Sequence, residues 1–177
     1  MMLRDYPWYR AVPGESTLEQ GDFLQNCPVV VPPAKYEAGE ETTVDIAEYN
    51  VIVMSQSCDI AQGKVDLILV CPVWSLVDFG GSNEIFKGNS GKEKLRRGEV
   101  VGYYLLNRCE EEDFEADFQV ADFRATYSVD ANFLQEFARE QPWRLRLLPP
   151  YREHLSQAFA RFFMRVGLPV DIPPFGK

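Results

Sequence analysis

The stretch YNVIVMSQSCDIAQGKVDLILVCPV, residues Tyr49–Val73, decides how this chain folds. It contains two short apolar runs rich in Val and Ile, Val51–Met54 and Val65–Val73, which are joined by the polar connection Ser55–Lys64. Short apolar runs bounded by turn-forming residues are typical of buried strands. We therefore predict a central pair of strands that carries the thiol of Cys58 at or near its tip.

Length and composition favour one packed domain. The chain has 177 residues, of which 46% are hydrophobic and 13% aromatic, enough to build a core without disulfides or metal ions. No internal repeat interrupts it. We treat residues 1–177 as a single domain with three parts: an N-terminal arm (1–20), a β-rich part (21–128) and a helical C-terminal part (129–177).

Charge and hydropathy limit the classes of function. The 18 basic and 27 acidic residues leave a net charge of −9, and such a field repels nucleic-acid backbones and anionic membranes. No apolar run reaches the roughly 18–20 residues needed to span a bilayer. The first residues also lack the apolar segment of a signal peptide. We therefore expect a cytoplasmic protein with no membrane contact and no DNA partner.

The four cysteines lack the spacing of a metal site. They contain no C-x2-C pair, and cytosolic thiols are normally reduced. Cys27 and Cys71 each precede a proline beside an apolar run, which is typical of small buried hydrophobic residues. We therefore expect no bound metal, and the sequence has no motif for an organic cofactor.

Aromatic residues and prolines shape the N-terminal third. Tyr6, Trp8 and Tyr9 are expected to pin the arm across the core surface, because aromatic rings bury a large area for little chain length. A first strand should include Cys27–Val31. Its prolines cannot donate to a strand ladder, so we expect an edge strand or a strand broken into two pieces. Thr42–Ile46 could add another short strand.

The region 74–98 is irregular and holds the only dense basic cluster. Its glycines indicate turns. The cluster consists of Lys87, Lys92, Lys94, Arg96 and Arg97. Gly91-Lys92 lacks both the upstream glycine and the following Ser or Thr of a phosphate-binding P-loop. We interpret the region as a solvated surface loop, with binding of phosphate or an acidic partner as the alternative.

Two further segments have the pattern of strands. Glu99–Leu106 is apolar and rich in aromatic and β-branched residues. From Phe118 the apolar residues alternate, and the alternation changes phase once, near Ala121-Asp122. This pattern predicts one long strand, running to Tyr127 and bent by a β-bulge, of the kind that closes small barrels. The acidic run between these segments should be a solvated loop.

The period changes to that of helices in the C-terminal part. Asp130 can cap a helix over Ala131–Glu140, and residues 143–148 alternate like a strand. Pro149-Pro150 then opens the clearest helix, Tyr151–Val166, which ends before Gly167. Its apolar stripe consists of Tyr151, Leu155, Phe159, Phe162, Phe163 and Val166, and its opposite face carries His154, Gln157, Arg161 and Arg165.

Cys58 is the first candidate for chemistry. A nucleophilic thiol needs a base and an orienting group, and His154 is the only histidine that could serve as the base, with Asp59 beside the thiol. The competing interpretation is a turn in which the side chains of Ser55–Asp59 bond to the backbone. The sequence therefore leaves two interpretations open: a catalytic set of Cys58, Asp59 and His154, or a turn with a purely structural role.

Basic and acidic residues provide two more candidate sites. A phosphate-binding or nucleic-acid-binding set would consist of Lys92, Lys94, Arg96, Arg97 and Arg108, near the aromatic residues Phe86, Tyr103 and Tyr104. Charge combined with stacking is typical of single-strand recognition, although the net charge opposes it. Carboxylates at predicted strand ends could instead form an acid–base pair or ligate a metal, but no spacing selects two of Asp22, Asp59, Asp66 and Asp78.

Three segments together resemble a known family. Gly21-Asp22-Phe23, Val51–Gln56 and Leu69–Val73 are similar to the G-D-[IV], P-V-V-V-L-S and V-V-P-[IL]-T segments of MazF/PemK-like proteins. The resemblance covers about a third of the chain. It implies a small SH3-like β-barrel, and many members of that family are endoribonuclease toxins. The family's catalytic arginine would fall near Tyr49-Asn50 and its threonine at Trp74, so no catalytic residue is carried over.

These observations combine into one expected architecture. We predict an α+β fold: a small, strongly bent, mainly antiparallel β-barrel of the SH3-like or PemK-like kind, with two C-terminal helices packed on it. Agreement between the strand pattern, the bulge and the late helices supports this choice.

Three functions follow. The first is a non-enzymatic intracellular module that binds a protein partner or a second copy, or regulates a bacterial stress or defence system. The second is a MazF-like endoribonuclease with a rearranged site, in which Arg96, Arg97 or Arg108 stabilises charge on the phosphate of an RNA partner. The third is a hydrolase or transferase that depends on Cys58.

Overall fold

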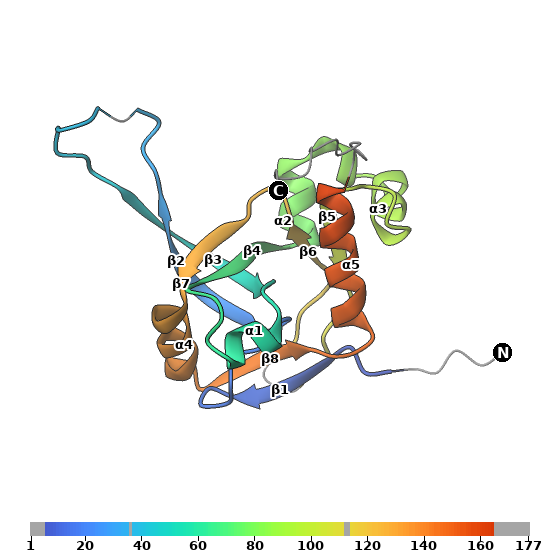
Figure 1. The fold of residues 1–177 in the computed structure, drawn as a ribbon. Helices are drawn as coiled ribbons and strands as arrows, with labels where there is room; N and C mark the ends of the chain where they lie inside the picture. The colour runs from blue at the N-terminus through green and yellow to red at the C-terminus, as the bar shows by residue number, and fades with distance from the viewer. Residues whose placement is uncertain (1–5, 36, 112–113, 165–177) are drawn as a thin grey trace, which may run out of the picture.

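The computed structural model describes residues 6–35, 37–111 and 114–164 (Figure 1). The fold is α+β and its sheets are antiparallel, as predicted. A six-stranded sheet has the order β2-β3-β4-β6-β5 with β7 also paired to β4, and β1 and β8 form a separate two-stranded sheet. The strands are β1 (Tyr9–Pro13), β2 (Phe23–Val31), β3 (Asp45–Val53), β4 (Leu67–Ser75), β5 (Tyr103–Leu106), β6 (Gln119–Asp122), β7 (Tyr127–Asp130) and β8 (Trp143–Leu147).

The predicted central pair of strands is confirmed. β3 and β4 are antiparallel neighbours, with Val51 opposite Pro72 and Val53 opposite Val70. The connection between them contains a short helix, α1 (Ser57–Ala61), which turns its Ile60 into the core. Val51–Met54 is buried, and so is most of the second run from Ile68 onward, because these residues lie in the middle of the sheet, whereas Leu67 is exposed.

The predicted long bent strand is wrong in one respect. It is divided into β6 and β7, which pair with successive parts of β4, and a turn at residues 123–126 separates them. The side chain of Asp122 accepts a hydrogen bond from the backbone N–H of Arg124 at 2.9 Å, and the Thr126 hydroxyl donates to the Phe123 carbonyl. These local bonds compete with strand pairing, so the phase change marks a turn and not a bulge.

No closed barrel is seen in the described part of the chain. The sheet is an open path whose ends are β2 and β5, and no strand pairing joins these two edges. The observed structure therefore supports a mainly antiparallel α+β fold, while barrel closure and the SH3-like topology stay predictions.

The region predicted as a solvated loop is largely helical. It forms α2 (Leu76–Ser82), η1 (Glu84–Phe86) and α3 (Asn89–Arg96). Ser75 caps α2 by accepting a hydrogen bond from the N–H of Asp78. A Cβ at Gly91 would lie 1.8 Å from the Ile85 carbonyl oxygen, so this glycine permits close packing of α3 on η1. Gly91, which indicated a turn in the sequence, is thus a helix-packing position, whereas Gly98 does lie in a turn, with a positive φ of 66°.

The two C-terminal helices are confirmed within the described residues. Asp130 caps α4 (Ala131–Glu140) by accepting hydrogen bonds from the N–H groups of Asn132 and Phe133. The second helix, α5 (Tyr151–Phe163), buries Leu155 fully in a group of core residues that includes Tyr9, Phe123 and Leu147, which we call the second core cluster. Its Phe163 is exposed, and the predicted continuation to Val166, like Arg165, lies outside the described residues. No described helix is long and apolar enough to cross a membrane.

The strand expected at 143–148 is confirmed as β8, and its partner is the N-terminal arm. β1 pairs with β8 from Tyr9 opposite Leu147 to Pro13 opposite Trp143. Tyr9 is buried and its hydroxyl donates to the Asn107 carbonyl at 2.8 Å, while Trp8 stacks on Tyr151. The prediction that aromatic residues pin the arm is therefore confirmed for Trp8 and Tyr9, whereas Tyr6 is exposed.

A buried ionic network joins the β1–β8 sheet to the turn before β2. The Asp22 carboxylate is fully buried and forms ion pairs with Arg144 and Arg146 of β8. Arg144 is also buried and donates to the backbone carbonyls of Gly14, Ser16 and Ala138. This network accounts for Asp22, which the sequence had offered as a candidate active-site carboxylate.

β2 lies at an edge of the large sheet, as its prolines predicted. Its pairing with β3 shifts between Leu24 and Cys27, where Asn26 has a positive φ of 50° and its N–H donates to the Asn50 side chain. Beyond this irregularity, β2 and the first half of β3 extend from the body of the molecule as a two-stranded projection, which we call the β2–β3 arm to distinguish it from the N-terminal arm (Figure 1). The strand expected at 42–46 exists only as the start of β3 at Asp45.

Candidate ligand-binding cleft

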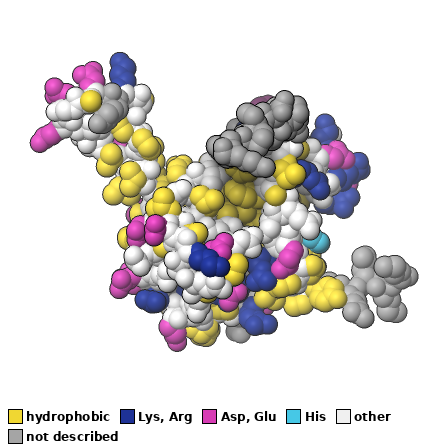
Figure 2. All heavy atoms as spheres, viewed as in Figure 1, with side chains coloured by type: hydrophobic (Ala, Val, Ile, Leu, Met, Phe, Trp, Pro, Cys, Tyr) yellow, Lys and Arg dark blue, Asp and Glu magenta, His cyan; other side chains and the backbone are white. Residues whose placement is uncertain are grey.

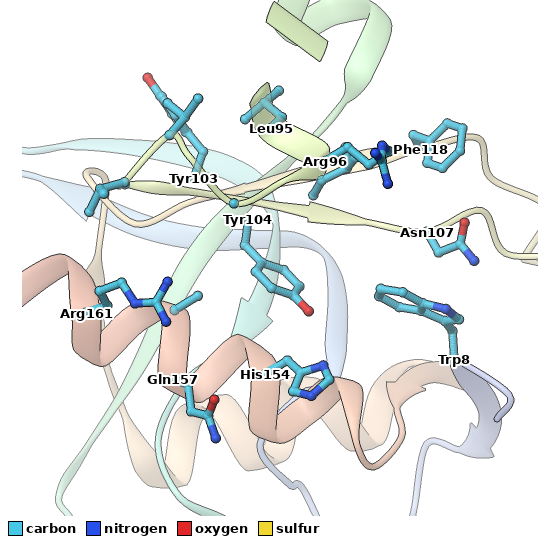
Figure 3. Close-up of a pocket in the computed structure, with 16 residues that line it drawn as sticks. Trp8, Leu95, Arg96, Tyr103, Tyr104, Asn107, Phe118, His154, Gln157 and Arg161 are labelled. Atoms are coloured by element: carbon cyan, nitrogen blue, oxygen red, sulfur yellow. The ribbon is translucent and has the colours of Figure 1, made fainter. Parts of the chain in front are cut away.

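A cleft of about 510 Å³ lies between β5, with the turn that precedes it, and helix α5 (Figure 3). Trp8 from the N-terminal arm, Arg96 from α3 and Phe118, which precedes β6, complete its walls. The cleft therefore unites four separate parts of the chain. Clefts of this size with aromatic walls and a few polar groups are the usual form of small-molecule sites.

Aromatic rings form much of the cleft wall. Trp8 is held in place by stacking on Tyr151, with ring centroids 3.7 Å apart and planes 10° apart. Tyr104 projects from β5 toward α5, with Trp8 and His154 beside it (Figure 3). Phe118 lies beneath Arg108, whose guanidinium carbon is 4.7 Å from the ring centroid. These fixed rings provide flat surfaces on which another ring can stack.

Tyr104 is suited to donate a hydrogen bond. Burial, with a smaller contribution from Tyr151, raises the pKa of the Tyr104 hydroxyl to about 12. The group therefore keeps its proton throughout the neutral range. A ligand atom that accepts hydrogen bonds would find a neutral donor at the centre of the cleft.

The polar groups of the cleft are cationic or neutral. His154, Gln157 and Arg161 come from α5 at spacings of three and four residues, so they follow one face of the helix. Arg161 has no ion-pair or hydrogen-bond partner among the described residues, whereas Arg96 is paired with Glu93. None of the residues that line the cleft is acidic, although the whole chain carries a charge of −9. The cleft is thus a local exception that favours an anionic ligand.

Two glycines shape the turn at the rim. Gly98 and Gly102 have positive φ values of 66° and 110°, which residues other than glycine rarely adopt. The carbonyl of Gly102 accepts a hydrogen bond from the N–H of Phe123 at 2.9 Å, which ties the turn to the sheet. The turn therefore brings its backbone close to the cleft without a side chain at these positions.

The predicted catalytic set is not assembled in this structure. His154 lines the cleft, but Cys58 and Asp59 lie on α1 and are not among the cleft residues. The exposed Cys58 thiol contacts only Asp59, at 3.7 Å from its Oδ1, and no described basic side chain contacts it. A catalytic pair of Cys58 and His154 therefore has no structural support, and His154 lies with the arginines of the cleft.

The structural alternative for the same stretch describes it well. The Ser55 hydroxyl accepts a hydrogen bond from the N–H of Leu69 at 2.9 Å, and the Ser57 hydroxyl accepts one from the N–H of Gln20 at 3.0 Å. The Gln20 side chain in turn donates to the Met54 carbonyl at 2.7 Å. The polar side chains thus bind the turn to β4 and to the segment before β2.

The predicted basic set is divided between the cleft rim and the surface. Arg96 lines the cleft, and Arg108 reaches it indirectly through Phe118 while pairing with Asp117 at 2.8 Å. Lys92, Lys94 and Arg97 lie on or next to α3 and do not line the cleft. Hydrogen bonds from Arg96, and then from Arg97, lower the pKa of Glu93 to about 2, so this carboxylate stays charged beside them.

Native alkylation should modify Cys58 and spare the other three cysteines. Cys58 is exposed, whereas burial raises the pKa of Cys27 to about 11 and that of Cys71 to about 12, and it also raises the pKa of the buried Cys109. Only the thiolate reacts. Iodoacetamide followed by peptide mass spectrometry at pH 7.5 should therefore find label on Cys58 alone, and on all four after unfolding in urea.

A Cys58-dependent enzyme makes a different prediction for the same experiment. Its thiol would react quickly even near pH 6, whereas the reaction of an ordinary exposed thiol slows steadily as the pH falls below about 8. The rate of Cys58 labelling as a function of pH therefore tests the third candidate function. A rate that stays high near pH 6 would support a Cys58-dependent enzyme, and a rate that falls steeply with decreasing pH would contradict it.

Comparison with known proteins does not assign this chain to a family. No protein-family model matches this sequence, and no curated protein is significantly similar to it. Among residues 6–35, 37–111 and 114–164, no group of three or more His, Cys, Asp or Glu side chains could hold a metal ion. The site must therefore be interpreted from its own geometry.

Sequence reasoning missed the cleft because its walls meet only in the folded chain. His154, Gln157 and Arg161 were recognised as one polar helix face, and Tyr104 as an aromatic neighbour of the basic cluster. Nothing in the sequence showed that Trp8 would stack on the start of that helix. The one available signal was a histidine and an arginine on the same face as a glutamine, opposite an unusually aromatic stripe.

Proposed function

We propose that this protein is a non-enzymatic regulatory module that binds an anionic ligand carrying a flat ring, of the nucleotide class, in the cleft between β5 and α5. The observation that supports this best is the composition of the cleft: two arginines, one histidine and four aromatic side chains without a single carboxylate. In a chain with a net charge of −9, a concave site free of acidic groups favours anions.

Each part of such a ligand has a matching group in the cleft. A base can stack on Tyr104 or against Trp8, which Tyr151 already holds in position. A phosphate can bind the guanidinium of Arg161, which is not engaged by any described carboxylate. The Tyr104 hydroxyl keeps its proton because burial raises its pKa to about 12, and it can donate to a ring nitrogen or a phosphate oxygen.

Titration with ADP, adenosine and inorganic phosphate tests this proposal. We expect ADP to bind more tightly than adenosine or phosphate, with a change in Trp8 fluorescence or a heat signal by calorimetry. Arg161→Gln should weaken ADP binding about tenfold, because a charge-assisted hydrogen bond contributes about 1.5–3 kcal/mol. Trp8→Leu should weaken it by a similar factor through lost stacking.

A matched control uses an arginine outside the cleft. Arg139 is exposed on α4, forms no described ion pair and does not line the cleft, so Arg139→Gln removes the same charge without touching the site. Equal weakening by Arg139→Gln and Arg161→Gln would show a nonspecific charge effect. Absence of ADP binding at millimolar concentration, or binding that neither Arg161→Gln nor Trp8→Leu alters, would contradict the proposal.

One observation favours the endoribonuclease alternative. His154, Tyr104 and Arg161 line the same cleft, and these are the residue types that transfer protons and stabilise a phosphorane-like charge during RNA cleavage. In that case the resemblance to MazF/PemK-like proteins would extend to the reaction, with relocated residues. Labelled RNA incubated with the protein in EDTA should then be cut, and both His154→Ala and Arg161→Gln should abolish the cutting. RNA that stays intact supports the binding module.

A further inference from the structure

The outer face of the β2–β3 arm is apolar and uncovered. Val30 lies directly opposite Ile46, and these two side chains are 59% and 68% exposed, while Val44, which immediately precedes β3, is 50% exposed. Neighbouring positions alternate between faces, so Val29 points the other way and is buried in the core. Figure 2 shows hydrophobic side chains gathered along this arm. A cross-strand apolar pair in water marks a contact surface.

The end of the arm is acidic. Five carboxylates flank the apolar face, and none of them forms a salt bridge within the described residues: Glu37, Glu40, Glu41, Asp45 and Glu48. Lys35 is the one basic residue described in this part of the arm. The arm therefore offers apolar side chains next to unpaired negative charge.

The helical unit α2–η1–α3 has the complementary character. Val77 and Ile85 are 71% and 67% exposed on it, and they are accompanied by lysines of α3. Lys92 and Lys94 form no salt bridge with any described residue, unlike Arg96 and Arg97, which pair with Glu93. This unit therefore combines apolar side chains with positive charge that forms no described salt bridge, although Lys92 also interacts electrostatically with Asp117.

We propose that two copies of this chain form a two-fold dimer in which the arm of each copy packs on the α2–η1–α3 unit of the other. Within one copy the arm extends away from the body and does not reach these helices (Figure 1). Every copy carries both the arm surface and the helical surface. A reciprocal pairing of two copies therefore covers all four surfaces and leaves none free to bind a third copy. The interface joins Val30, Val44 and Ile46 to Val77 and Ile85, with the arm carboxylates facing Lys92 and Lys94.

Sedimentation equilibrium tests the apolar part of this interface. We expect the unaltered protein to be a dimer at micromolar concentration and Ile46→Asp to raise the dissociation constant at least tenfold. Because Ile46 is exposed, the substitution should leave the thermal unfolding of the monomer unchanged. Phe133→Asp is the control: it also puts a carboxylate on an exposed apolar site, but in the first turn of α4, and it should stay dimeric.

A charge exchange tests the reciprocal arrangement itself. One variant carries Glu40→Lys and Glu41→Lys, so the arm of one copy repels the lysines of α3 in a second copy of the same variant. The other variant carries Lys92→Glu and Lys94→Glu, so the arm carboxylates of one copy repel the new glutamates of a second copy. Each should be monomeric alone, and an equimolar mixture should form a heterodimer, because both of its contacts again join opposite charges. Added salt should weaken both the dimer of the unaltered protein and this heterodimer.

Several outcomes would overturn the dimer. A monomeric protein at 100 μM or above, a mixture of the charge variants that stays monomeric, or open-ended oligomers that grow with concentration would each contradict it. Unchanged dimerisation of Ile46→Asp would show that the arm is not the contact. The outcome is independent of the cleft, since none of the substituted residues lines it.

Discussion

Replacing Asp22 with alanine is expected to lower the free energy of unfolding by about 3–5 kcal/mol, because it leaves Arg144 buried without its counter-charge. Both side chains of this pair are fully buried. Arg146 would also lose its partner and retain only Glu19 and the Thr17 carbonyl. Since the network joins the β1–β8 sheet to the start of β2, the loss should spread to the packing of the N-terminal arm.

Urea unfolding followed by circular dichroism measures this effect, and two variants control for it. Glu15→Ala removes an exposed carboxylate from the same loop and should change stability by less than about 0.5 kcal/mol. Arg144→Met in the Asp22→Ala background removes the orphaned charge and should recover part of the loss, as is seen when buried pairs are replaced by apolar residues. A destabilisation by Asp22→Ala of less than about 1 kcal/mol would contradict a buried network.

Replacing Leu155 with alanine should cost about 2–5 kcal/mol of stability, the range for truncating a fully buried leucine. Leu155 is the buried anchor of α5 in the second core cluster. The helix it fixes carries His154, Gln157 and Arg161 along the cleft. We therefore expect the same change to weaken ligand binding, although Leu155 itself does not line the cleft.

Thermal unfolding and ADP titration of the same sample separate these two effects. Leu155→Met conserves volume and should cost less than about 1.5 kcal/mol while preserving binding. A stable Leu155→Ala protein with unaltered binding would show that the cleft does not depend on how α5 is anchored. Loss of both properties in Leu155→Met as well would indicate that the shape of this one position, and not its burial, matters.

Elements with strong local signals were predicted from the sequence. The two Val- and Ile-rich runs are paired strands because nothing but the core can bury them. Asp130 caps α4 because its side chain lies within reach of the first free N–H groups of the helix, which is a local property. Side chain to backbone hydrogen bonds were also predicted for the polar segment after β3, but Ser55 and Ser57 make them to Leu69 and Gln20, 14 and 37 positions away.

Elements that depend on contacts between distant parts of the chain were not predicted from the sequence. The glycines of residues 80–98 indicated turns, yet Gly91 is needed where α3 packs on η1. The division of residues 118–130 into β6 and β7 depends on how each half pairs with β4, which the alternation of apolar residues cannot reveal. The partner of β8 proved to be the N-terminal arm, at the other end of the chain.

By itself, the sequence determined the α+β class, the central strand pair, the helix cap and the exposure of one face of the last helix, because periodicity and capping act within a few residues. Only the tertiary structure decided which residues share a site. It placed His154 beside Tyr104 and Trp8 and away from Cys58, and it buried Asp22 between two arginines. Such contacts join residues about 50 to 150 positions apart, and their energy depends on burial that exists only after the chain has folded.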